Sequence, residues 1–144
     1  MTLGRYAPPS EVFRESAGDL QAPVVTASVS PPPYDGRMTR ELVAPLDTGS
    51  GPTVVSERLT GELGLVPCDY RQCVTYENEE PKLYPVCSLE VVVSGSFVDI
   101  VRAVVMPIRT HLVIGRDVLN RLRVTLDASQ GLVELRASVV QSGP

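Results

Sequence analysis

The chain of 144 residues is long enough for one domain with one hydrophobic core. Hydrophobic residues make up 43% of it and charged residues 21%, a composition that argues against wholesale disorder. The net charge of −4, the scattered Lys and Arg residues and the lack of a long apolar run favour a cytoplasmic protein that binds neither nucleic acid nor membranes.

The composition also favours β structure with many turns. Trp is absent and there are only two Phe, so the core must consist mainly of Val and Leu. The 11 Gly and 13 Pro are typical of turns. Residues 1–22 show little periodicity, so we expect a flexible N-terminal arm, one domain at 23–140 and a polar tail at 141–144.

In chain order, the first predicted element is a hairpin. Its strands lie at 23–29 and 40–46, and it leads directly into Asp47. Ser56 can then cap a short helix that ends near Gly64. The later predicted elements are a strand, tip and returning strand over 67–85, a hairpin over 88–105, a buried strand ending at Gly115, a helix over 116–122 and a hairpin turned at 128–131. Such a chain is mainly β, with the strand spacing of a barrel or a sandwich.

The three cysteines, Cys68, Cys73 and Cys87, do not suggest a disulfide framework, because their number is odd. His111 is the only histidine, and these four residues fit none of the common zinc spacings. We therefore expect reduced structural thiols, with no metal and no cofactor. A Cys–His catalytic pair is a distant alternative, because no third group that would orient the histidine stands out.

The most informative segment is ELVAPLDTGSGPTVV, residues 41–55. In it Asp47 follows an apolar run, and Gly49 lets the backbone approach its carboxylate closely. The carboxylate can then accept bonds from backbone donors and from Ser50. One rigid carboxylate is a weak catalyst of amide hydrolysis, whereas two that share a proton provide one acid and one base.

The second carboxylate must come from elsewhere, because Asp-Thr-Gly occurs once in the chain. Asp127, in VTLDASQG, is followed by Ala-Ser-Gln and is better explained as part of a hairpin turn. A homodimer with C2 symmetry would instead bring Asp47 twice to its axis. The sequence therefore suggests a dyad with one Asp47 from each chain.

Two segments, APLDTGSGPTVV at 44–55 and HLVIGRDVLNRL at 111–122, give the chain a resemblance to the retropepsin-like aspartic proteases, which include retroviral proteases and small bacterial members. The family carries a hydrophobic run and Asp-Thr/Ser-Gly-Ala/Ser, followed later by two hydrophobic residues, Gly and often Arg-Asp/Asn. The resemblance covers about residues 23–136. It implies a closed, barrel-like acid-protease fold with one or two short helices, and an endopeptidase most active at acidic pH.

The resemblance also implies roles for individual residues. Asp47 would be the catalytic aspartate, and Thr48 would bond across the dimer to its mate. Ser50 would bond the outer carboxylate oxygen and favour ionisation. The residues that would contact substrate, some of them on a flap hairpin at about 74–86 that closes over it, are Gly49, Gly51, Tyr76, Glu77, His111 and Val113. Those that would support the site are Ile114, Gly115, Arg116 and Asp117.

The chain departs from the retroviral pattern at three places. Gly51 stands where retroviral members often carry an acid that pairs with the arginine of the Gly-Arg motif, so Arg116 needs another partner. The flap tip, TYENEEPKL, has no glycine and is acidic, which could favour basic substrates. The N-terminal arm offers no clear partner for the sheet of interleaved termini that holds retroviral dimers together.

Alternatives therefore stay open. Arg116 and Asp117 could simply begin a helix, where an acid is favourable, and the flap glutamates are best explained as a solvated loop. For the protein as a whole, the second hypothesis is a non-catalytic retropepsin-like module that dimerises or binds extended peptides. The intact Asp-Thr-Gly-Ser sequence favours the peptidase.

Overall fold

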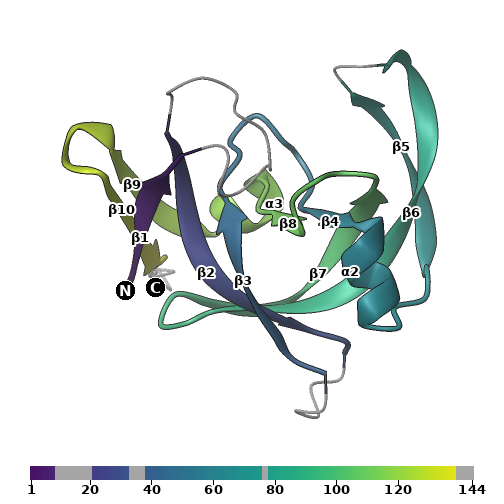
Figure 1. Ribbon diagram of the computed structural model, residues 1–144, viewed down its shortest axis with the longest axis horizontal. Coiled ribbons are helices and arrows are strands. Elements are labelled where there is room, and N and C mark those ends of the chain that lie inside the picture. Colours follow the sequence, from purple (N-terminus) through teal and green to yellow (C-terminus); the bar gives the residue numbers. More distant parts are fainter. Residues whose placement is uncertain (9–20, 33–37, 76–77, 139–144) are drawn as a thin grey trace, which may run out of the picture.

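The computed structural model describes residues 1–8, 21–32, 38–75 and 78–138 (Figure 1). Within these ranges the chain is mainly β with two short α-helices, which confirms the predicted fold class. The strands are β1 (Thr2–Ala7), β2 (Ala22–Ser30), β3 (Arg40–Pro45), β4 (Val54–Ser56), β5 (Asp69–Thr75), β6 (Asn78–Val93), β7 (Phe97–Met106), β8 (Leu112–Val113), β9 (Leu122–Asp127) and β10 (Leu132–Ala137). The helices are α2 (Glu57–Glu62) and α3 (Arg116–Leu119), and a short 3-10 helix, η1 (Ala128–Gln130), joins β9 to β10.

The strands belong to one sheet of ten strands in the order β8-β4-β7-β6-β2-β1-β10-β9, with β3 also paired to β2 and β5 to β6. Neighbouring strands run antiparallel, except that β4 and β7 are parallel. The sheet is not closed as a barrel would be, because its terminal strands, β8 and β9, do not pair with each other. Helix α3 connects these two terminal strands along the chain.

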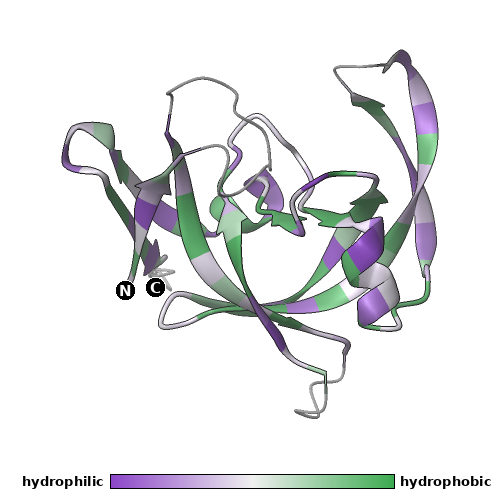
Figure 2. Ribbon diagram, viewed as in Figure 1, coloured by the Kyte–Doolittle hydropathy of each residue, from purple (hydrophilic) through white to green (hydrophobic). Residues whose placement is uncertain are grey.

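The core consists mainly of Val and Leu, as the composition predicted. Figure 2 shows the apolar residues concentrated in the strands, while α2 is largely hydrophilic. The largest fully buried side chains are Leu59, Leu89, Leu112, Ile114, Leu135, Val24, Val25, Val29, Val55, Val91, Val93 and Val104. Two of them, Leu112 and Ile114, come from the second predicted motif, so that motif is anchored in the core.

Residues 2–7, at the start of the segment 1–22 that was predicted to be a flexible arm, form strand β1. Strand β1 lies between β10 and β2 and runs antiparallel to both, with Gly4 opposite Val133. A side chain at Gly4 would not fit, because its Cβ would lie 2.3 Å from the carbonyl oxygen of Val24. Residues 9–20 and the tail from 139 onward lie outside the described residues, so the prediction for them is not tested.

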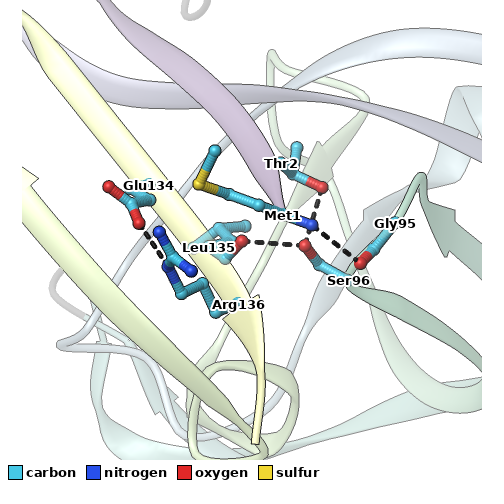
Figure 3. A network of polar contacts seen from close by, with 7 residues as sticks. All are labelled: Met1, Thr2, Gly95, Ser96, Glu134, Leu135 and Arg136. Carbon is cyan, nitrogen blue, oxygen red and sulfur yellow. Dashed lines mark hydrogen bonds and ion pairs between the residues drawn. The ribbon is translucent and has the colours of Figure 1, made fainter.

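A polar network fixes the start of β1 to the turn between β6 and β7 (Figure 3). The hydroxyl oxygens of Thr2 and Ser96 lie 2.8 Å apart, and the Ser96 hydroxyl donates to the carbonyl of Leu135 on β10 at 2.9 Å. The amino group of Met1 donates to the carbonyl of Gly95 at 3.2 Å. The strand therefore forms despite its weak sequence pattern, because two neighbouring strands and this turn supply its partners.

Helix α2 follows the prediction closely. The Ser56 hydroxyl accepts a bond of 3.0 Å from the backbone N–H of Leu59, and the helix ends before Gly64, whose φ is 63°. Helix α3 is shorter than predicted, because Leu122 already belongs to β9. In the described part of the chain, no helix is long and apolar enough to cross a membrane.

The hairpin predicted to be a flap and the last hairpin have the predicted connections. The first of these hairpins pairs β5 with β6, from Asp69 opposite Val86 to Thr75 opposite Asn78. Strand β6 continues without a break into the hairpin with β7, so two predicted strands form one strand of 16 residues. The final turn lies at 128–131 as predicted, and the positive φ of 65° at its last residue explains the glycine there.

Candidate active site

Asp47 lies where β3 ends beside the second predicted motif. Leu46 forms a parallel bridge with Ile114, and the backbone N–H of Asp47 donates to the carbonyl of Ile114 at 2.9 Å. In return, the N–H of Ile114 donates to the carbonyl of Pro45 at 3.0 Å. The two motifs are therefore adjacent in space, and their junction rests on the buried side chains of Leu46 and Ile114.

The Asp47 carboxylate is held at the exposed end of this loop. Its Oδ1 accepts a bond of 2.9 Å from the backbone N–H of Gly49. A Cβ on Gly49 would lie 3.1 Å from the same oxygen, so the glycine allows the amide to approach without crowding. Asp47, Thr48 and Gly49 are all exposed in the single chain. The carboxylate is therefore both positioned and accessible.

Ser50 does not make the predicted bond to the Asp47 carboxylate. Its hydroxyl donates to the carbonyl of Pro52 at 2.7 Å, while its backbone N–H donates to the carbonyl of Asp47 at 3.2 Å. Short hydroxyl side chains commonly bond to backbone groups two residues away, and this bond closes the turn after the carboxylate. The amide of Gly49, and not the hydroxyl of Ser50, holds Asp47 in place.

The start of α3 supports the loop through its backbone. The N–H groups of Arg116 and Asp117 donate to the carbonyls of Ser50 and Gly51 at 2.8 and 3.0 Å. Gly115 is required for this approach, because a Cβ there would lie 2.3 Å from the carbonyl oxygen of Pro52. The Gly of the second motif therefore has a packing reason: it lets α3 lie directly against the site loop.

Asp117 also holds the loop with its side chain, through Thr53, a residue that the sequence interpretation missed. The Asp117 carboxylate accepts bonds from the hydroxyl and the backbone N–H of Thr53, at 2.7 and 3.0 Å. The Thr53 hydroxyl also accepts a bond of 3.2 Å from the N–H of Gly115. Thr53 is completely buried, so each of these polar groups has its partner inside the protein. Its only sequence signal is a hydroxyl residue directly before the apolar Val54-Val55 pair.

Asp117 also lies in the first turn of α3, as the helix-start explanation expects, and its carboxylate accepts a bond of 2.8 Å from the N–H of Val118. That explanation is incomplete, because the same carboxylate also accepts the bonds from Thr53.

Arg116 has a different position. It is exposed, and its Nη2 lies 3.5 Å from where a Cβ on Gly51 would be. Among the described residues it forms no ion pair. Gly51 therefore leaves this arginine without the acid that retroviral members often provide.

The four predicted substrate-contact residues that lie outside the Asp47 loop fall into two groups. Val113 pairs with Val54 between β8 and β4, and the carbonyl of His111 accepts a bond of 2.9 Å from the N–H of Ser56. Both Val113 and His111 are half-buried, and His111 lines a surface pocket of about 370 Å³. Tyr76 and Glu77, the two residues predicted on the flap, lie outside the described residues, so their predicted contacts are not tested.

The cysteines are free thiols, as predicted, and differ in exposure: Cys68 is exposed, Cys73 is half-buried and Cys87 is buried. Burial raises the pKa of the Cys87 thiol, and the nearby Cys68 raises it further. Within the described ranges, no group of three or more His, Cys, Asp and Glu side chains is placed to hold a metal ion.

The fold is shared with a solved structure described as a retropepsin-like aspartic protease from Rickettsia conorii. The two chains superpose with a TM-score of 0.54 at 16% sequence identity, and the match covers 83% of this chain and 86% of the other. No protein-family model and no curated protein matches the sequence. A likeness at this identity establishes the fold alone, so the predicted acid-protease fold is confirmed.

Proposed function

We propose that the chain is an aspartic endopeptidase that acts as a homodimer on peptide or protein substrates. The observation that carries the proposal is the Asp47 carboxylate, held by the amide of Gly49 on an exposed loop whose base is tied to Ile114. A rigid and accessible carboxylate is the group that acid–base hydrolysis of an amide requires. The acid-protease fold agrees with this activity but does not by itself determine it.

The proposal requires two chains, because each provides one such carboxylate. A C2 axis beside the loop would bring the two Asp47 side chains together, and Thr48 would bond across the axis. Carboxylates about 3 Å apart cannot both ionise, so one of them keeps a proton. The exposure of Asp47, Thr48 and Gly49 in the single chain agrees with a surface that a second copy covers.

The two carboxylates then divide the chemistry. The ionised carboxylate takes a proton from a water molecule while the water oxygen attacks the carbonyl carbon of the peptide bond. The protonated carboxylate gives its proton to the carbonyl oxygen, and the resulting tetrahedral intermediate breaks its C–N bond as the nitrogen takes a proton from the dyad. The products are a carboxyl group and an amine, and the mechanism requires no cofactor.

Substrate would bind between the site loop and the flap. The hairpin of β5 and β6 would close over an extended peptide and exclude water, with Tyr76 and Glu77 near its tip. Gly49 and Gly51 would contact the substrate backbone, and Val113 would form part of a pocket wall.

A second candidate function is a non-catalytic module that dimerises or binds extended peptides. One observation favours it: β1 pairs with β2 and β10 of its own chain. The N-terminal strand is therefore already used within the chain, so a sheet of interleaved termini would require it to leave this position. A dimer that forms differently need not bring the two Asp47 residues together.

The deciding experiment is cleavage of a mixed peptide library between pH 3 and 7, with products identified by mass, for the wild type and for Asp47→Asn. The proposal predicts internal cuts that are strongest at acidic pH and disappear in the variant. Analytical ultracentrifugation at the assay concentration gives the oligomeric state. A dimer that makes no cut at any pH would refute the peptidase and favour the binding module.

A further inference from the structure

The pocket that His111 lines contains several side chains that are or can become cationic. Its volume is about 370 Å³, and it is lined by Ser56, Arg58, Ile108, Arg109 and His111. Its lining residues come from the end of β4, the start of α2 and the segment between β7 and β8. Arginine is always charged in proteins, and a histidine side chain becomes cationic in mildly acidic solution. Three of the five lining residues can therefore attract an anion.

Among the described residues, no Asp or Glu lines the pocket. Glu57 is exposed at the start of α2, and Glu62, near the other end of the helix, forms an ion pair with Arg40. In the described part of the chain, Arg58 forms no ion pair.

Arg109 and His111 each take part in a further interaction. This does not exclude an anion, because a guanidinium group carries five N–H donors and one contact does not exhaust them. Ile108 and the aliphatic parts of the two arginine side chains provide apolar surface in the same pocket. The pocket therefore suits a ligand with a short apolar stem and an anionic end.

The pocket is within reach of a peptide bound at Asp47. The backbone N–H of Asp47 bonds to the carbonyl of Ile114, and the chain runs from Ile114 back through β8 to His111. These three residues of extended chain span about 10 Å. An extended substrate also rises by about 3.3 Å per residue, so three of its residues span a similar distance. A substrate side chain roughly three residues from the cleaved bond can therefore reach the pocket.

We propose that this pocket is a substrate subsite that selects an acidic side chain, glutamate or aspartate, roughly two to four residues from the cleaved bond. The proposal rests on the peptidase function proposed above. The guanidinium groups of Arg58 and Arg109 bind the carboxylate through charge-assisted hydrogen bonds, and Ile108 contacts its methylene groups. The subsite thus selects the opposite charge from the basic substrates that the acidic flap sequence suggested.

The test uses a peptide that the wild type cleaves, remade with Glu, Gln or Lys at each of the four positions on either side of the cut. At about pH 5.5 glutamate is ionised, and we expect Glu to be preferred over Gln at one position by about tenfold in kcat/KM, less at high salt. The ratio of kcat/KM for the Glu peptide to that for the Gln peptide should fall to near one in the double variant Arg58→Gln/Arg109→Gln. It should persist in the control Arg123→Gln, which changes an exposed arginine on β9. Arg58→Glu should shift the preference towards Lys.

The outcomes separate the subsite from the peptidase. If the wild type cleaves but treats Glu and Gln alike at every position, or prefers Lys, the subsite is refuted and the peptidase stands. If the wild type cleaves nothing, the peptidase is refuted. The pocket is then tested by binding of fluorescein-labelled Glu and Gln peptides to Asp47→Asn. Tighter binding of the Glu peptide that is lost in the double arginine variant supports the pocket as a peptide site, and equal affinities refute it.

Discussion

The bond pair between Thr53 and Asp117 gives the sharpest stability prediction. Asp117→Ala removes the acceptor of two Thr53 donors and of the Val118 N–H. Hydrogen bonds to a charged group contribute about 1.5–3 kcal/mol each, and the buried Thr53 groups would lose their only carboxylate partner. Asp117 is partly exposed, so water can replace part of the lost hydrogen bonding. We therefore expect a loss of about 3–5 kcal/mol in the free energy of unfolding. A domain of this size loses roughly 3 °C of Tm per kcal/mol, so Tm should fall by roughly 10 °C.

Urea unfolding followed by circular dichroism measures this loss. The matched control is Asp99→Ala, because Asp99 also bonds the next backbone N–H but forms only an exposed ion pair with Arg121. It should cost less than about 1 kcal/mol. In a double-mutant cycle, Thr53→Val and Asp117→Ala should show a coupling of about 1–2 kcal/mol. A cost for Asp117→Ala no larger than the control, or a coupling near zero, would show that this contact does not hold the loop.

Three further predictions concern other parts of the chain. Gly115→Ala should cost more than about 3 kcal/mol in urea unfolding, because its Cβ would clash with a carbonyl of the site loop. Gly61→Ala, in α2 with open space around it, should instead stabilise by about 0.5–1 kcal/mol; equal effects of the two changes would contradict the packing account. Gly51→Asp should give Arg116 an ion pair worth about 0.5 kcal/mol at low salt, detected as a Tm increase that high salt removes. Since burial raises the pKa of Cys87, this thiol should react slowest of the three with a thiol reagent near pH 8, and equal rates in native buffer would show that it is accessible.

Local signals predicted those parts of the fold that depend on local interactions. The cap at Ser56, the turn at 128–131 and the strands around both motifs follow from capping, turn chemistry and apolar runs. The position of Ile114 near the site was implied by the resemblance that the two motifs carry. It could not have been derived from either segment alone, because a bridge between them is a tertiary contact.

The sequence interpretation failed where long-range contacts decide the structure. Strand β1 has little alternation of its own and forms because β2 and β10 supply its hydrogen bonds on both sides. The bond between Thr53 and Asp117 joins residues 64 positions apart, so no local pattern reveals it. The hydroxyl of Ser50 had two acceptors within reach, and only the backbone conformation determines that it bonds to Pro52.

The most direct test of the central claim, a dyad with one Asp47 from each chain, is a mixing experiment. Wild type and Asp47→Asn are allowed to exchange subunits in equal amounts, at a total concentration where the protein is dimeric, and peptide cleavage is measured. Random pairing leaves only about one quarter of the dimers with two Asp47 residues, so activity per wild-type chain should fall to about half of its unmixed value. Activity per wild-type chain that is unchanged by mixing, after subunit exchange has been verified, would mean that one Asp47 suffices and would contradict the shared dyad.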